Sequence, residues 1–159
     1  MTFDQAFDKL LGFEGGYSFN AADPGGETMW GVTARVARLA GYAGEMRDLP
    51  RDTAKAIYRR QYWDACQCDE FPDRLNYILF DGAVNSGVAQ STVWLQRALK
   101  VNDDGVIGPK TLAAARESID PLLPARMLAH RLRFMSSLPT WPAFGRGWAN
   151  RIAMNILEA

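Results

Sequence analysis

Apolar residues recur at helical spacing along nearly the whole chain, and this periodicity is what most limits the folds open to it. Breaks rich in glycine, proline or aspartate separate the periodic segments, and no convincing run of alternating residues predicts a strand. We expect seven or so helices from the periodic segments, eight in number, that begin near residues 3, 33, 52, 75, 92, 109, 121 and 144. The pattern predicts a mainly α fold whose core lies between helices.

The first periodic segment carries a carboxyl group where its pattern calls for a core residue. Leu10 and Leu11 belong to the apolar stripe, and Glu14 falls next on it. We expect Gly15 and Gly16 to end the helix, which would place Glu14 in its last turn. Burial and the nearby helix carbonyls would then both raise the pKa of this carboxyl group, as a general acid requires. The alternative is a solvated glutamate at a frayed helix end.

Residues 20–26 are dense in turn formers and predict a loop or a short irregular hairpin. Asp23 lies in this loop, and Glu27 and Thr28 follow it directly. An acid on a helix end together with an acid on a returning loop is typical of the paired carboxylates of glycoside hydrolysis. The aromatic residues of this stretch, whose flat rings suit either sugar faces or the core, are Tyr17, Phe19 and Trp30.

Several motifs, in this order, resemble the N-acetylmuramidases of glycoside hydrolase family 108, which include phage endolysins. In the first half they are Glu-Gly-Gly-Tyr at 14–17, Asp-Pro-Gly-Gly-Glu-Thr at 23–28 and Gly-Val-Thr at 31–33. In the second half, the segments 80–87, 95–99 and 104–111 resemble the predicted peptidoglycan-binding region that accompanies this family. The resemblance covers about residues 3–151. It implies a lysozyme-like single domain with a small irregular loop or hairpin beside the end of the catalytic helix.

The resemblance also implies an activity and assigns residues to it. The protein would be a lysozyme that cleaves the β-1,4 bond between N-acetylmuramic acid and N-acetylglucosamine, with Glu14 as the general acid. Asp23, nine residues after Glu14, would stabilise the cationic sugar or orient a water. Phage lysozymes place a threonine six residues after that aspartate, but Thr28 is only five residues after it. Thr28 and Thr33 therefore both remain candidates, and Thr33 is also the expected N-cap of the helix at 33–40.

The periodic segment that begins near residue 75 carries a polar stripe. Tyr77, Asp81 and Asn85 are spaced by four, so they share one face of the expected helix. The stripe would either line a cleft or cap neighbouring elements. The resemblance favours the cleft for Asn85, and for Asp81 both interpretations stay open. The candidates for substrate binding are thus Tyr17, Trp30, Thr33, Tyr77, Asp81 and Asn85.

The composition argues against several classes of function. Acidic and basic residues balance at 18 each, so the chain lacks the excess of basic residues that nucleic-acid-binding proteins usually carry. Cys66 and Cys68 are too close in sequence for an easy mutual disulfide, and His130 is the only histidine. The acidic turn at 102–105 lacks the ligand spacing of an EF-hand. We expect no metal and no cofactor.

We expect a catalytic lobe at 1–65 and a helical lobe at 66–159 resembling the peptidoglycan-binding region, integrated into one domain. The first residues lack the features of a signal peptide, and no apolar run approaches the roughly 20 residues of a membrane span. The expected protein is a monomer made in the cytoplasm, without a stable membrane anchor. Its partner is the glycan strand of peptidoglycan, and a holin would give it access to the wall.

Two other functions fit parts of the sequence. A non-catalytic peptidoglycan-binding module would use the second-half motifs, although it would have no reason to bury Glu14. A lytic transglycosylase would use Glu14 as both acid and base and would leave Asp23 dispensable. The sequence does not distinguish a retaining from an inverting mechanism, because that depends on the distance between the two carboxyl groups.

Overall fold

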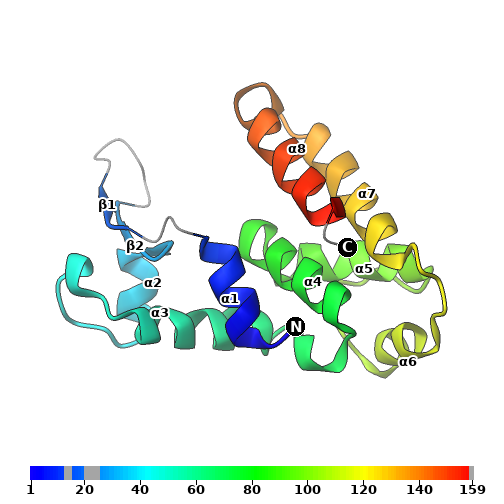
Figure 1. Ribbon diagram of the computed structural model, residues 1–159, viewed down its shortest axis with the longest axis horizontal. Helices are drawn as coiled ribbons and strands as arrows, with labels where there is room; N and C mark the ends of the chain where they lie inside the picture. The colour runs from blue at the N-terminus through cyan, green and yellow to red at the C-terminus, as the bar shows by residue number, and fades with distance from the viewer. Residues whose placement is uncertain (13–15, 20–25, 158–159) are drawn as a thin grey trace. The chain divides into compact units, whose positions relative to one another are not determined.

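The computed structural model describes residues 1–12, 16–19 and 26–157 of the chain (Figure 1). The chain forms two compact units. We call residues 3–61 the N-terminal unit, and residues 62–159 with residues 1–2 the C-terminal unit. The helices are α1 (Phe3–Leu11), α2 (Ala34–Leu39), α3 (Arg51–Tyr58), α4 (Asp73–Ser86), α5 (Val88–Leu99), α6 (Pro109–Glu117), α7 (Leu123–Ser136) and α8 (Trp141–Leu157). The prediction of a mainly α fold is confirmed.

The first helix is shorter than the sequence pattern predicted. α1 ends at Leu11, and Gly12 takes a left-handed conformation with φ +56° while its N–H bonds the carbonyl of Asp8. Gly12 is therefore the glycine that ends the helix, and the expectation that α1 runs on to Gly15 is wrong. The helical spacing that links Leu10 and Leu11 to Glu14 in the sequence gives no sign that the backbone leaves the helix at Gly12.

The N-terminal unit contains a small antiparallel sheet with strand order β1 (Ser18–Phe19), β2 (Glu27–Met29), β3 (Val32–Thr33). β2 and β3 form a hairpin in which Met29 pairs with Val32, so Trp30 and Gly31 are its two turn residues. Both have positive φ, +54° and +72°, as a type I′ turn requires. Strands of two or three residues are too short to produce a readable alternation, which is why the sequence predicted only a loop or hairpin here.

The hairpin turn packs tightly on α3. A Cβ added at Gly31 would lie 2.5 Å from the hydroxyl oxygen of Tyr58, so the close approach requires glycine as much as the positive φ does. The Tyr58 hydroxyl also donates to the carbonyl of Trp30. Below it, the rings of Phe7 and Tyr58 meet edge to face at 5.4 Å between centroids. This core joins α1, α3 and the hairpin.

The C-terminal unit is built around α4, most of which is buried. α5 and α7 pack on it, and α8 packs on α7 (Figure 1). A Cβ at Gly82 would lie 2.4 Å from Oγ of Ser91, whose hydroxyl donates to the carbonyl of Leu79. The absence of a side chain at Gly82 therefore permits the close approach of α5 to α4.

Two local predictions concern helix starts. α6 begins at Pro109, which confirms the start expected near residue 109; the missing N–H of proline is tolerated at the first position of a helix. α8 begins at Trp141 rather than near residue 144, because Pro142 occupies its first turn, where a proline is tolerated. None of the helices in the described ranges combines the length and apolar character needed to cross a lipid bilayer.

Candidate functional site

The two carboxyl groups predicted to carry out catalysis, Glu14 and Asp23, lie outside the described residues. The described part of the chain resumes at Gly16 after Glu14 and at Gly26 after Asp23. Tyr17 precedes β1 and Thr28 is the middle residue of β2. These segments meet in the small sheet of the N-terminal unit.

Tyr17 is held at the sheet by an acidic and a basic side chain. Its hydroxyl donates to Oε1 of Glu27 at 2.6 Å, and the guanidinium carbon of Arg47 lies 5.5 Å from the centre of its ring. The hydrogen bond to Glu27 raises the pKa of the Tyr17 phenol. The ring stays 38% exposed, so it is oriented by its hydroxyl and remains open to a ligand. Sequence reasoning missed Arg47, which carries no motif.

Thr28 and Thr33 are brought together. They are direct partners on β2 and β3, and Ser18 pairs with Thr28 on the other side, which gives a row of three hydroxyl residues across the sheet. Directly paired residues share one face, and neighbours along a strand point to opposite faces. The hydroxyl row therefore lies on the face opposite to the side chain of Glu27.

Thr33 also has a structural role. Its Oγ1 accepts a hydrogen bond from the N–H of Val36 at 3.4 Å, which makes it the N-cap of α2, as predicted. This role competes with substrate binding for the same oxygen atom.

Trp30 is fixed within the N-terminal unit. Its indole N–H donates to the carbonyl of Leu49 at 2.9 Å, and the guanidinium of Arg51 lies 5.9 Å from its ring centre. Arg51 in turn forms an ion pair with Asp8 at 2.6 Å. These contacts give Trp30 a clear part in holding the hairpin turn, and its side chain is only partly exposed.

The three residues of the polar stripe all lie on α4 but differ in exposure. Tyr77 is buried, Asp81 is completely buried, and Asn85 is exposed near the end of the helix. The Nδ2 of Asn85 donates to the carbonyl of Asp81 at 2.7 Å. Of the three side chains, that of Asn85 is the one open to solvent.

Asp81 joins three helices of the C-terminal unit. Its Oδ1 accepts from Nε of Arg151 at 2.8 Å, and its Oδ2 accepts from Nδ2 of Asn155 at 3.0 Å and from Arg131. Burial alone would raise the pKa of Asp81, but the charges of Arg131 and Arg151 outweigh it and lower the pKa. These contacts favour the interpretation in which Asp81 caps neighbouring elements.

The acidic turn at 102–105 is organised by a buried glutamine that sequence reasoning did not single out. Nε2 of Gln96 donates to Oδ1 of Asp104 at 2.8 Å and to Oγ1 of Thr111, and its Oε1 accepts from the N–H of Gly105. The hydrogen bond from Gln96 leads the contacts that lower the pKa of Asp104. Gln96 thus holds the Asp-Gly-Val-Ile-Gly-Pro-Lys-Thr motif in place. The sequence signal that could have identified Gln96 was its position within the motif at residues 95–99.

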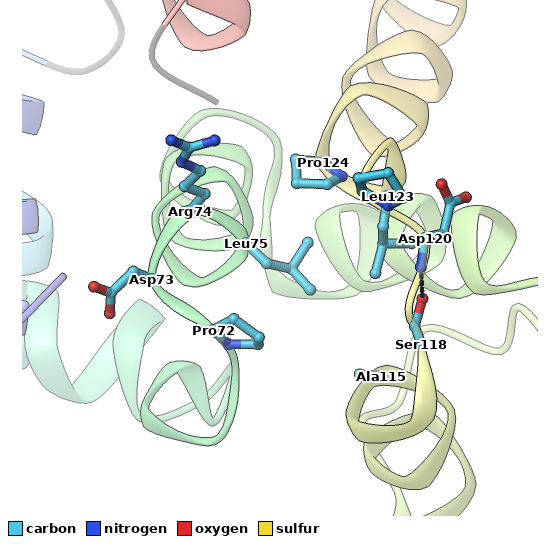
Figure 2. A pocket seen from close by; sticks show the side chains of 10 residues that line it. Pro72, Asp73, Arg74, Leu75, Ala115, Ser118, Asp120, Leu123 and Pro124 are labelled. Carbon is cyan, nitrogen blue, oxygen red and sulfur yellow. Dashed lines mark hydrogen bonds between the residues drawn. The ribbon is translucent and has the colours of Figure 1, made fainter.

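The C-terminal unit contains a cavity of about 360 Å³ between the start of α4, the end of α6 and the start of α7 (Figure 2). Pro72 and Leu75 lie across from Leu123 and Pro124, so its walls are largely apolar (Figure 2). Neither Tyr77 nor the other residues of the polar stripe line it.

The described ranges contain no group of three or more His, Cys, Asp or Glu side chains that could hold a metal ion. Cys66 and Cys68 are buried free thiols. Burial, together with the neighbouring Cys66, raises the pKa of the Cys68 thiol, so it stays protonated and unreactive.

Comparison with known proteins gives matches along nearly the whole chain. Residues 7–87 match the family described as glycosyl hydrolase 108, and residues 90–153 match a predicted peptidoglycan domain. Among solved structures, that of Brucella abortus SagA is 32% identical, with a TM-score of 0.84, over 96% of this chain and 90% of that one. No curated protein matches significantly.

Proposed function

This chain belongs to the glycosyl hydrolase 108 family and is a peptidoglycan hydrolase of the muramidase type, and we propose that Glu14 is its general acid. The expected lysozyme-like fold is confirmed by the same comparisons. Support for Glu14 comes from its position within the matched residues 7–87 and from the Glu-Gly-Gly-Tyr motif. A protonated carboxyl group beside the glycosidic oxygen would donate its proton as the bond to the leaving sugar breaks.

Asp23 is proposed as the second carboxylate of the reaction. An ionised carboxylate on the other side of the sugar ring would stabilise the developing positive charge or orient the attacking water. Its support is the loop motif that carries it and the spacing from Glu14. Replacing Asp23 by alanine should strongly lower hydrolysis. A variant with full activity would leave Asp23 without a role.

The described residues in and beside the sheet divide into those that we propose contact the substrate and those that hold the fold. We assign Thr28 to the substrate, since the hydroxyl of Thr33 already caps α2. Tyr17 would offer its ring to a sugar face while Glu27 holds its hydroxyl. Trp30 would act mainly by holding the hairpin turn in place.

In the second half of the chain, Asn85 is proposed to contact glycan, with Tyr77 supporting the helix beneath it. Asp81 would act on substrate only through the helices that it joins. We propose residues 1–65 as the catalytic lobe and residues 66–159 as the lobe that completes the fold and holds glycan. The two compact units, which divide between residues 61 and 62, support a boundary near residue 65, whereas the two family matches divide the chain later, between residues 87 and 90.

Analysis of the products from purified sacculi tests the reaction itself. A muramidase adds water, so every cut creates a reducing N-acetylmuramic acid end that borohydride reduces, with the corresponding mass change. A lytic transglycosylase would instead give anhydro ends, which borohydride leaves unchanged. Anhydro products alone would replace hydrolysis by that reaction, and bound but undigested sacculi would favour the non-catalytic binding module.

We further propose that the protein acts as a monomer and in an endolysin-type role, where a holin gives access to the wall. The family resemblance supports this role. Expression of the gene with and without a holin gene tests it, with culture lysis expected only for the pair. Lysis by the protein alone would contradict the need for a holin, and light scattering measures the monomer mass directly.

A further inference from the structure

Four side chains gather on the face of the small sheet that lies opposite to the hydroxyl row. Phe19 pairs directly with Glu27 across β1 and β2, so their side chains point to the same side. The Tyr17 hydroxyl donates to Oε1 of Glu27, and the guanidinium of Arg47 lies over the Tyr17 ring. We call Tyr17, Phe19, Glu27 and Arg47 the Glu27 face.

The two aromatic rings of the Glu27 face are open to solvent. Phe19 is 61% exposed and Tyr17 is 38% exposed. Side chains two residues apart on one face of a strand are separated by about 7 Å along it, so the rings offer two neighbouring flat apolar surfaces. The apolar C–H faces of sugar rings stack on surfaces of this kind.

Arg47 is presented by a short segment that the core anchors. It lies in the 3₁₀ segment Met46–Asp48, which packs on β2. Met46 and Leu49 are buried on either side of Arg47, whose own side chain is exposed. Among the residues that the structure describes, no carboxylate forms an ion pair with Arg47. Its guanidinium can therefore donate hydrogen bonds to a ligand.

The two charged side chains complement each other as donor and acceptor. A guanidinium only donates hydrogen bonds, and an ionised carboxylate only accepts them. Tyr17 engages Oε1 of Glu27, and the carboxylate has a second oxygen that can accept from a ligand. A sugar carries hydroxyl and acetamido groups that both donate and accept, so one unit stacked on the rings can bind both side chains. A charged ligand would instead be repelled by either Glu27 or Arg47.

We propose that the Glu27 face is a sugar-binding subsite, in which the two rings stack on the glycan strand and the two charged side chains bind its polar groups. The proposal rests on the protein's function as a peptidoglycan hydrolase, and the face lies within the residues 7–87 that match the hydrolase family. The side chain of Thr28 points to the opposite side of the sheet. The Glu27 face would therefore hold a different sugar unit from the one at Thr28.

Contacts on the Glu27 face would hold the strand and leave bond cleavage to other residues. They are made equally in the ground state and in the transition state, so their loss raises KM and leaves kcat unchanged. Displacement of a residue that takes part in bond cleavage would lower kcat instead. The two kinetic constants thus separate a subsite from a structural effect on the catalytic groups.

The test is the hydrolysis of soluble, uncross-linked glycan strands, followed by the appearance of reducing ends over a range of strand concentrations. Phe19→Leu keeps an apolar side chain but removes the ring, whereas Phe19→Trp keeps a ring. Leu39→Ala is the control, because Leu39 is an even more exposed apolar residue of the same unit. Arg47→Met is compared with Arg60→Met, the same change at another exposed arginine of that unit. Thermal unfolding confirms that each variant is folded.

We expect Phe19→Leu to raise KM about three- to tenfold, the value of an aromatic contact. Arg47→Met should raise it about two- to fivefold, the value of a hydrogen bond. Phe19→Trp should restore the wild-type KM, both controls should match the wild type, and kcat should stay unchanged throughout. Folded Phe19→Leu and Arg47→Met proteins with a wild-type KM would overturn the proposal, and so would a loss confined to kcat.

A failure of the hydrolysis itself is recognised separately. If the wild type cuts no strand, the proposed reaction is contradicted, and titration calorimetry of the same strands then decides on the subsite. Weaker binding by Phe19→Leu with restored binding by Phe19→Trp would support the subsite without the activity. Equal dissociation constants for these two variants and the wild type would overturn it.

Discussion

Thr28 and Thr33 lie directly opposite each other on β2 and β3, although only Thr33 caps a helix. The sequence left these two threonines as equal candidates for the active site. Their pairing places both hydroxyl groups on one face of the sheet. The hydroxyl of Thr33 caps α2, so we assign the substrate contact to Thr28. The hairpin thus offers a matched pair of positions for separating stability from activity.

Replacing each threonine by valine keeps the shape and removes the hydroxyl. Thr33→Val should lower the free energy of unfolding by about 0.5–1 kcal/mol, because α2 loses its N-cap. Thr28→Val should change stability little and lower kcat/KM up to about tenfold, the value of one neutral hydrogen bond. Denaturant unfolding and the rate of sacculus digestion measure the two effects. A reversed pattern would give the catalytic role to Thr33.

Gly31→Ala should destabilise the hairpin by about 1–3 kcal/mol. Its φ of +72° is unfavourable for alanine, and the new Cβ would collide with the Tyr58 hydroxyl. Tyr58→Phe removes that oxygen, so the double variant should lose less stability than the two single changes added together. Chemical unfolding of the four proteins measures this coupling. Strict additivity would mean that the collision contributes nothing.

Asp81→Asn should cost about 3–5 kcal/mol of stability, since Arg131 would keep its charge in the core while losing its partner. Arg131 is only 1% exposed; its Nη1 donates to Asp81, and its Nε and Nη2 atoms have no hydrogen-bond partner among the described residues. Asp103→Asn, at an exposed ion pair with Arg97, is the control and should leave the unfolding midpoint nearly unchanged. Equal midpoints for both variants would contradict the account of this cluster.

The same carboxylate gives stability a dependence on pH. The pKa of Asp81 is lower in the folded protein than in the unfolded chain. Its stabilising contribution is therefore complete above the unfolded value, about 3.9, and is lost as the pH falls through the folded value. Unfolding measured between pH 7 and pH 2 should show a steeper loss below about pH 4 for the wild type than for Asp81→Asn. If the stability of both proteins fell in parallel with pH, Asp81 would not contribute to the loss of stability in acid.

The helices were predictable because their apolar stripes repeat over several turns. The start of α6 at Pro109 and the cap of α2 at Thr33 also followed from single-residue chemistry. The end of α1 did not, because the helical spacing runs on from Leu11 to Glu14 although the backbone leaves the helix at Gly12. The hairpin turn was hidden for a related reason, since tryptophan at positive φ is not a recognised turn signal.

The candidate site was predictable only through its motifs. Spacing placed Tyr77, Asp81 and Asn85 on one face of a helix, but exposure separates them, and only the fold reveals the arginines that enclose Asp81. The contacts of Tyr17 with Glu27 and Arg47 likewise join residues that are far apart in the chain. Such pairings depend on tertiary structure and leave no local pattern.

The rate at which Glu14→Gln creates reducing ends in purified sacculi tests the central claim most directly. Glutamine keeps the size of the side chain but has no carboxyl proton to donate. Glu45→Gln makes the same change at an exposed residue of the N-terminal unit. With both variants folded, Glu14→Gln should be about 10²–10⁴-fold slower than the wild type, while Glu45→Gln keeps full activity. A folded Glu14→Gln that digests sacculi at the wild-type rate would contradict its role as the general acid.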